Sequence, residues 1–409
     1  MKIQRITSGA APFAGGAAAI LLAIAIVSAP ESSFAASLQG LKLWWTLVFP
    51  ALLPFLILSE MLTASGIIHG IGVLLEPLMN RIFRLPGAGG WTLALGMTAG
   101  FPAGAGAVIH LHKQGRITDK EAGRLASLAH YASPVTVLIV VGAAFLHSPA
   151  SGYVLLSIHW LAGLSAGCTS ALFAKRPKLQ SAISLKQPHH KRASLLIRIN
   201  RAAAEARLQD GRSFGRLLGE SISTAVQNLM IVGGYMIIFA VVIHIAASVF
   251  PQIPQALVSS LLEIHLGANM LTTGIKATSL TVYSHMDALE AAWLSAALGW
   301  SGICGQLQAL TLLKQAGVSY LPYAANRLLH GMYAFVFTIL LWKPLLNLQT
   351  IVQPVTSVPD EHMPAVILNP VAFWSSIPKL LGLQVLILLL LLALSAAVYV
   401  TASLRRPSA

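Results

Sequence analysis

The sequence is constrained most by a series of long apolar stretches, each close to the length that crosses a bilayer. A helix needs about 20 apolar residues to span about 30 Å of hydrocarbon. Only 10% of the 409 residues are charged, against about 25% in a soluble domain, so few charges are available to hydrate a soluble surface. We therefore predict an all-α polytopic membrane protein with about seven to nine spans. The predicted spans are 12–29, 45–66, 134–146 extended back through 124–132, 153–173, 225–250, 328–348 and 380–402.

The first apolar stretch has a second interpretation, because Lys2 and Arg5 precede it as they would in a secretory signal peptide. Its cleavage position is poor, since Pro30 follows Ser28-Ala29 directly. We therefore favour an uncleaved membrane helix.

The net charge of +14 is concentrated in one segment, with eleven Lys or Arg and two acids between Lys175 and Gly219. A basic segment between apolar runs is typical of a cytoplasmic loop under the positive-inside rule, facing anionic lipid. The sequence contains no nucleic-acid-binding module, which argues against a nucleic-acid partner. Cys168 and Cys304 both lie in apolar stretches and indicate neither a disulfide framework nor a metal site.

Two apolar segments, residues 91–111 and 288–313, are interrupted by glycine. Free backbone N–H and C=O groups cannot face lipid, so such segments are expected inside the protein as re-entrant hairpins or broken helices. The alternative is a kinked helix whose glycines allow close packing. The interrupting residues are Gly96, Gly100, Pro102, Gly104 and Gly106 in the first segment, and Gly299, Gly302 and Gly305 in the second.

The two interrupted segments match each other in order. Residues 94–98 parallel residues 297–301, and Arg124-Leu125 parallels Arg327-Leu328, both at a spacing of 203 residues. This ordered series predicts an internal duplication. The predicted organisation is an N-terminal membrane helix and linker (1–43), a first repeat (44–173), a basic cytoplasmic loop (174–220), a second repeat (221–349), an extramembrane loop (350–378) and a C-terminal membrane helix (379–409).

Duplicated halves with interrupted segments at corresponding positions are the best sequence signal for a transporter's binding site. With the basic loop inside, the first hairpin opens to the cytoplasm and the second opens outward, which is an inverted repeat. Inversion places Lys314 and Arg327 outside. If residues 288–313 simply span the membrane, both residues lie inside, which the positive-inside rule favours. We favour inversion and keep the spanning arrangement as the alternative.

Several short motifs carry a family resemblance across residues 44–349. Together they resemble the YlbJ-type sporulation integral membrane proteins, which carry the Gate (nucleoside-recognition) domain and are similar to concentrative nucleoside transporters. The resemblance implies two inverted repeats and a role in endospore formation, moving dipicolinic acid across the outer forespore membrane. The motifs are Gly100-Phe101-Pro102-Ala103-Gly104-Ala105, Arg124-Leu125, Ala132-Ser133-Pro134, Leu262-Glu263-Ile264 with Gly267, Gly299-Trp300-Ser301-Gly302-Ile303, Gln308 and Arg327-Leu328.

Two positions depart from the family pattern. Gly106 stands where a lysine often follows the first glycine run, and Gln306 stands where a histidine is usual. Both changes remove groups that can contact an anion, so they bear on the substrate more than on the fold.

The candidate substrate site consists of the two interrupted tips. Backbone N–H groups at the ends of short helices bind anions without a large fixed charge, and nearby side chains add neutral hydrogen bonds. The alternative is that the glycines serve close packing only. The predicted substrate-binding residues are Thr98, Gly100, Phe101, Pro102, Gly104, Ser133, Pro134, Gly299, Ser301, Gly302, Gln306 and Gln308.

Four acids, Glu60, Glu76, Glu263 and Glu290, lie in or beside apolar sequence. An ionisable residue inside a membrane is a functional candidate because its burial is costly. Glu263 precedes a predicted helix interruption, so we expect it to bind a coupling cation or a proton. The alternative is a carboxylate that caps a helix, which we favour for Glu76 and Glu290.

These features together predict a multi-pass cell-membrane transporter for a small anionic metabolite, and the family resemblance implies that this metabolite is dipicolinic acid. The sequence lacks a phosphate-binding loop, a zinc-protease motif and a nucleophile elbow, so we expect no enzyme activity and no cofactor. The alternatives are a nucleoside or other small-metabolite transporter of the same fold, and a non-transporting scaffold for spore-envelope assembly. No pattern indicates an oligomeric state.

Overall fold

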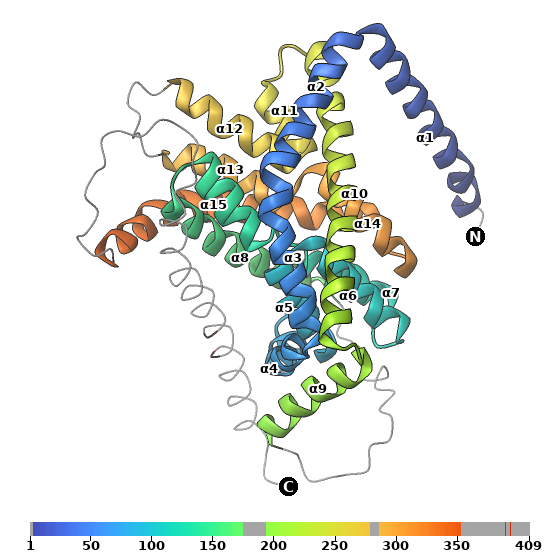
Figure 1. Cartoon of the computed structure of the whole chain (residues 1–409), viewed down its shortest axis with the longest axis vertical. Helices are drawn as coiled ribbons and strands as arrows, with labels where there is room; N and C mark the ends of the chain where they lie inside the picture. Colours follow the sequence, from blue (N-terminus) through green and yellow to red (C-terminus); the bar gives the residue numbers. More distant parts are fainter. Residues whose placement is uncertain (1–2, 175–193, 279–285, 353–388, 390–392, 394–409) are drawn as a thin grey trace.

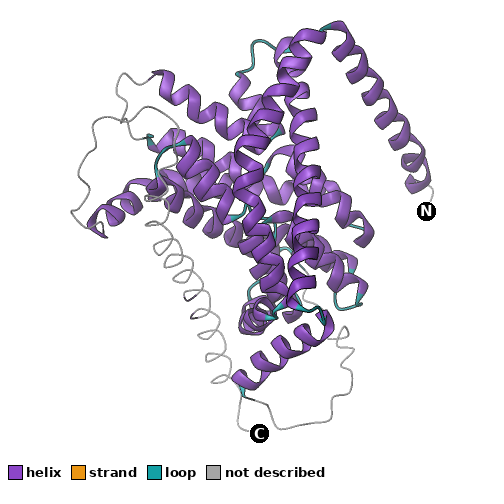
Figure 2. Cartoon of the chain, in the orientation of Figure 1, coloured by secondary structure: helices purple, strands orange, loops and turns teal. Residues whose placement is uncertain are grey.

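The computed structural model describes residues 3–174, 194–278 and 286–352, together with residues 389 and 393. Every regular element within these ranges is a helix (Figure 2). Nearly all of the predicted C-terminal span, 380–402, and of the predicted loop, 350–378, lies outside the described residues.

Four of the described helices are long and apolar enough to cross a membrane, and they coincide with four predicted spans. The first is continuous through α2, a π-helical turn η1 and α3. Two shorter apolar helices, Gly15–Ser28 and Thr136–Phe145, fall within two further predicted spans. The four candidate spans are Pro30–Ala64, Pro149–Leu172, Phe214–Val249 and Tyr320–Asn347.

The remaining helices are short and connect or support these spans. Local sequence sets several of their boundaries: Thr118 and Glu121 form a capping box at the start of α7, and Asp287 and Glu290 form one at the start of α13. The elements are α1 (Ile3–Ser28), α2 (Pro30–Leu43), η1 (Trp44–Val48), α3 (Phe49–Ala64), α4 (Ile67–Arg81), η2 (Gly87–Gly89), α5 (Gly90–Ala99), α6 (Phe101–Lys113), α7 (Asp119–Leu128), η3 (Thr136–Phe145), α8 (Pro149–Leu172), α9 (Leu195–Asp210), α10 (Phe214–Val249), α11 (Gln255–Leu262), α12 (Ile264–Thr278), α13 (Ala288–Trp300), α14 (Gly302–Leu313), η5 (Lys314–Ala316) and α15 (Tyr320–Val352).

The first spans of the two predicted repeats, α2–α3 and α10, pack side by side and antiparallel (Figure 1). A Cβ added to Gly40 would lie 2.9 Å from the Ala240 Cβ, and one added to Gly233 would lie 2.5 Å from the Trp44 ring. The Trp44 indole Nε1 donates a hydrogen bond to the Leu229 carbonyl oxygen at 2.9 Å. Small residues thus let the two helices approach closely. Their opposite directions agree with an inverted arrangement, which stays a prediction for the repeats as a whole.

The core lies around α8, which is largely buried, whereas α10 and α15 turn much of their surface outward. Helix α8 packs against η3 and α15, and α15 packs against α13. The segment predicted as a basic loop contains a surface helix, α9, which lies against α4. Its apolar residues explain why it folds: Ile199 fits against Gly70, where an added Cβ would lie 3.1 Å away.

Candidate substrate cavity

The first interrupted segment folds back on itself as a hairpin. Helix α5 ends at Ala99, and Gly100 adopts φ 90° and ψ −177°, a conformation available only to glycine. Helix α6 then returns along α5, because a Cβ added to Gly104 would lie 3.3 Å from the Gly96 Cα. The glycines therefore serve both the sharp turn and the close approach of the two arms.

The second interrupted segment is broken at Ser301 and Gly302, which have φ of 65° and 64°. Its arms lie against different partners: α13 packs on α15, and α14 packs on α6. Gly299 contacts Gly331 of α15, where an added Cβ would lie 2.8 Å from the Gly331 Cα. Gly302 sits against the Leu262 carbonyl oxygen, at 2.9 Å from an added Cβ. The break therefore adjoins the junction between α11 and α12.

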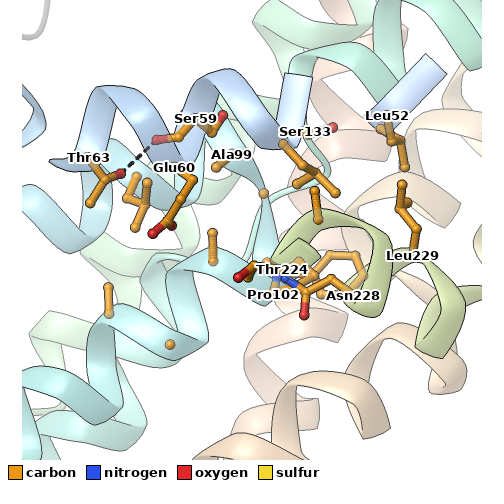
Figure 3. Close-up of a pocket in the computed structure, with 18 of the residues that line it drawn as sticks. Leu52, Ser59, Glu60, Thr63, Ala99, Pro102, Ser133, Thr224, Asn228 and Leu229 are labelled. Carbon is orange, nitrogen blue, oxygen red and sulfur yellow. Dashed lines mark hydrogen bonds between the residues drawn. The ribbon is translucent and has the colours of Figure 1, made fainter. Parts of the chain in front are cut away.

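A cavity of about 410 Å³ lies beside the tip of the first hairpin, between α3 and α10 (Figure 3). Both predicted repeats contribute to its wall. Glu60 and Thr63 of α3 lie on one side of the view, and Thr224 and Asn228 of α10 lie near Pro102. Its polar lining comprises Ser59, Glu60, Thr63, His110, Ser133, Thr136, Ser221, Thr224, Asn228 and His265.

The predicted site residues divide between this cavity and its surroundings. Gly100, Phe101, Pro102 and Ser133 line the cavity. Thr98, Gly104, Pro134, Gly299, Ser301, Gly302, Gln306 and Gln308 do not line it.

Several of the residues outside the cavity have their polar groups engaged elsewhere. The Thr98 hydroxyl donates to the Ala94 carbonyl oxygen at 2.8 Å, within its own helix. The Gln306 amide donates to the Trp300 carbonyl oxygen at 3.0 Å, and the Gln308 amide donates to the Cys304 Sγ at 3.3 Å. These contacts hold the helices around the second break.

The N-terminus of α6 supplies free donors to the cavity. No side chain caps this helix, so the backbone N–H groups of Phe101 and Ala103 lack the intrahelical acceptors that later residues have. Both residues line the cavity. The helix dipole adds partial positive charge at the same end, so this wall favours an anionic group.

His130 joins the first tip to the second break, and the sequence did not mark it as a site residue. The Phe101 ring stacks on the His130 imidazole with centroids 4.7 Å apart and planes 12° apart. His130 Nε2 is 2.8 Å from the Ser301 hydroxyl, and its Nδ1 bonds the Tyr323 hydroxyl. His130 is buried and directly precedes Tyr131-Ala132-Ser133-Pro134. Its place before that helix break is the one sequence signal for it.

Arg327, which carries part of the family resemblance, is buried beneath this contact. Its guanidinium donates to the carbonyl oxygens of Ser127 and His130 and lies 3.1 Å from His330 Nδ1. Within the described residues no carboxylate pairs with it. The carbonyl end of α7 therefore supplies its negative partner, which ties α15 of the second half to α7 of the first.

Glu263 lies between α11 and α12 with 2% of its surface exposed. Its carboxylate bonds His265 Nδ1 at 2.8 Å and accepts the Leu266 backbone N–H at 2.7 Å. His265, which the sequence prediction missed, lines the cavity. Its position two residues after Glu263 was the available signal.

The other three acids each have a local partner. Glu290 completes the capping box of α13, Glu76 pairs with Arg198 of α9, and Glu60 lies 3.2 Å from Arg212. The Glu290 contacts match the helix-capping alternative. Glu60 differs from the other two because it also lines the cavity.

A hairpin interrupted by glycine, antiparallel first spans and a cavity between them define a polytopic helical membrane protein. The Gate family model, described as nucleoside recognition, matches residues 45–166, which includes the first hairpin. The chain is also 37% identical over 343 residues to the sporulation integral membrane protein YlbJ of Bacillus subtilis (strain 168). That similarity covers 80% of this chain and 81% of the relative.

The chain therefore belongs to the YlbJ family of sporulation integral membrane proteins, and it is a multi-pass membrane protein. No solved structure matches it.

Proposed function

We propose that this protein is a membrane transporter that moves a small metabolite through the cavity beside the α5–α6 break. The observation that carries the proposal is the place of the cavity: it lies between antiparallel spans of the two halves, at an interrupted helix. Transporters bind their substrates at such interruptions because unwound backbone supplies polar groups within the membrane. The proposal includes no catalytic step and no cofactor.

The substrate that we propose first is a small planar anion, and the family resemblance names dipicolinate. Phe101 and Ala103 line the cavity at the start of α6, which has no side-chain cap, and no described lysine or arginine lines the cavity beside them. Their backbone N–H groups can therefore bind a carboxylate and release it again. The outer forespore membrane is the corresponding proposed location.

A neutral metabolite such as a nucleoside is the second candidate. Of the described residues that line the cavity, none is lysine or arginine, and Glu60 brings a carboxylate to the wall. Trp91 and Phe101 offer aromatic surfaces to a planar ring. These contacts suit an uncharged planar ring.

The remaining alternative, a scaffold for envelope assembly, would act through the basic segment and α9. Helix α9 exposes apolar residues, including Leu196 and Leu208, and presents Arg201 on the surface. A scaffold would need this helix and not the cavity, so the two functions separate experimentally.

The deciding experiment measures uptake of labelled dipicolinate and labelled uridine by vesicles reconstituted with the full chain. Gly106 lines the cavity and an added Cβ there meets no atom within 4 Å, so Gly106→Leu introduces a bulky side chain at the cavity wall from a Cβ in open space. Gly234 of α10 has the same freedom but lies on the exposed side of that helix. Gly234→Leu is therefore the matched control.

We expect wild type and Gly234→Leu to take up one of the probes above the level of protein-free vesicles, and Gly106→Leu to lose that uptake. Equal uptake by both variants would refute the cavity as the route. No uptake of either probe, with loss of sporulation function on removing residues 195–210, would favour the scaffold.

A further inference from the structure

Two helix interruptions of the second half meet at Glu263. The first is the junction of α11 and α12, where Glu263 has the extended angles φ −142° and ψ 126°. The second is the α13–α14 break, since a Cβ added to Gly302 would lie 3.1 Å from the Glu263 Cα. A buried carboxylate at crossed helix breaks has the setting in which transporters hold coupling ions.

Both carboxylate oxygens of Glu263 are already occupied by N–H donors. Oε1 bonds His265 Nδ1 at 2.8 Å, and Oε2 accepts the Leu266 backbone N–H at 2.7 Å. A hard metal cation needs several oxygen ligands, and an oxygen that accepts an N–H presents a positive hydrogen to its surroundings. This geometry therefore disfavours a sodium ion at Glu263.

His265 has the opposite character, because it retains one unused nitrogen. The side chain is 7% exposed and lines the cavity. Its Nδ1 faces Glu263, and its Nε2 has no hydrogen-bond partner among the described residues. A neutral imidazole that donates Nδ1–H to a carboxylate keeps a lone pair on Nε2. That lone pair is a vacant proton acceptor beside the cavity.

We propose that transport is coupled to a proton that binds Nε2 of His265 while Glu263 holds the imidazole. This inference rests on the proposed function. The proton comes from water on one side of the membrane and leaves to water on the other. Binding changes the His265–Glu263 pair from one net negative charge to none.

This charge change links the proton to an anionic substrate. An unprotonated pair repels an anion in the same cavity, and protonation removes that repulsion. By reciprocity, a bound anion raises the affinity of His265 for its proton by the same factor. The pair is therefore a positioning and coupling element, separate from the α6 donors that contact the substrate.

The titratable groups around His265 define which variants test this. Of the elements packed against α12, α11 and η3 carry none, α14 contributes Cys304, and α13 carries Glu290, which caps its own helix with Asp287. Helix α10 also packs against Leu266 and carries His244, which lines a separate pocket with Leu266 and Met270. Helix α12 itself carries Lys276, about three turns further along. The cavity wall adds Glu60 and His110. Glu60 and His110 are the groups that could imitate a pH response.

The experiment uses vesicles with the full chain, labelled dipicolinate or uridine, and an internal pH dye. A one-unit pH gradient is worth about 1.4 kcal/mol per proton, so one coupled proton sustains about tenfold accumulation. We expect a proton gradient to drive accumulation of the probe by the wild type, with a matching change of pH inside the vesicles. A sodium gradient at equal pH should not drive accumulation.

The variant His265→Gln should lose accumulation but keep one-for-one exchange of labelled for unlabelled probe, because exchange needs no net proton movement. The matched control is His112→Gln, which breaks the other described histidine–carboxylate pair, 2.8 Å from Asp119 and outside the cavity. It should accumulate as the wild type does. Glu60→Gln and His110→Gln test the two titratable groups of the cavity wall. If either variant loses proton-driven accumulation while His265→Gln keeps it, the coupling proton does not bind His265.

Sodium-driven accumulation, or wild-type flux that no pH gradient affects, would overturn the inference while leaving the transport proposal standing. The dye measurement on the wild type gives this result even if His265→Gln fails to fold. Full accumulation by His265→Gln would also overturn it. Absence of uptake of both probes would overturn the transport proposal and this inference together.

Discussion

The two glycine-punctuated segments share a sequence pattern, but the structure uses them differently. In the first, Gly96 and Gly104 face each other, α5 and α6 form a hairpin, and the tip lines a cavity. In the second, Gly299 packs against α15 and Gly302 against the α11–α12 junction. The first break makes an open surface, whereas the second is enclosed by other helices.

This difference shows what a glycine pattern determines. Glycine permits a turn or a close approach, so its positions predict where a helix is interrupted. Whether the interruption faces a cavity depends on which helices pack beside it. Those neighbours, such as α10 at the first tip and α11 at the second break, come from distant parts of the sequence.

The largest expected difference between the two segments is in thiol labelling. Ala103 lines the cavity one residue after Pro102, whereas the native Cys304 follows the second break and is 1% exposed. In a Cys168→Ala background, Ala103→Cys should react with a small polar maleimide and Cys304 should not. A substrate probe should slow the reaction at residue 103. Rapid labelling of Cys304 would show that the second break is open to solvent.

The next difference is in stability, and it compares two equivalent alanine substitutions. A Cβ at Gly104 would lie 2.6 Å from the Ala129 backbone carbonyl oxygen, but a Cβ at Gly305 meets only the Phe101 ring, at 3.4 Å or more. Gly104→Ala should therefore cost about 1–3 kcal/mol from overpacking, and Gly305→Ala should be close to neutral. Thermal unfolding in detergent measures both. Equal unfolding temperatures would mean that α6 does not pack against Ala129 as described.

Much of the fold follows from the sequence because membrane helices depend on local composition. Four described spans coincide with predicted apolar runs, and the breaks at Gly100 and Ser301-Gly302 fall within the predicted interrupted segments. Helix α9 escaped prediction because its apolar residues are interspersed with arginines in a basic segment. Its docking against Gly70 and Gly66 depends on contacts that no local pattern records.

The sequence predicts only the part of the candidate site that the first interrupted segment and the Ser133-Pro134 motif contribute. Gly100, Phe101, Pro102 and Ser133 belong to contiguous motifs and line the cavity. Thr224 and Asn228 reach it from α10, more than a hundred residues away in the sequence, and nothing in the local sequence around them indicates a site. The contacts of His130 and His265 became visible only in the packed structure.

A smaller difference separates two serines of the predicted site. Ser133 lines the cavity and bonds Thr136, whereas Ser301 holds His130 at 2.8 Å outside the cavity. Ser133→Ala should raise the KM for uptake about two- to tenfold, as expected for a neutral hydrogen bond of about 0.5–1.5 kcal/mol. Ser301→Ala should lower thermal stability by leaving His130 Nε2 unpaired, with KM unchanged. If Ser301→Ala raised the KM and Ser133→Ala lowered only the stability, the substrate would bind at the second break and not at the first.

The smallest expected effect lies at Arg212, which precedes α10 and pairs with Glu60 of α3 at the edge of the cavity. Arg212 contacts Asp210 at 2.5 Å, Glu220 at 3.3 Å and Glu60 at 3.2 Å. Hydrogen bonds from Arg212 hold the pKa of Asp210 below its ordinary value of 3.8. Because folding lowers this pKa, the contact stabilises the fold at pH values above the ordinary pKa of aspartate. The stabilisation is lost as the pH falls through the lower pKa of the folded state.

Arg212→Gln should therefore lower the unfolding temperature slightly at pH 7, by an amount corresponding to about 1 kcal/mol or less because solvent screens the pairs. The difference in unfolding temperature between this variant and the wild type should become smaller below pH 4 and in high salt. The matched control is Arg216→Gln, which removes an exposed partner of Glu220 without touching Glu60. If the difference in unfolding temperature persists in acid, Arg212 acts through packing rather than charge. If Arg216→Gln lowers the unfolding temperature by the same amount, the Arg212–Glu60 contact adds no stability of its own.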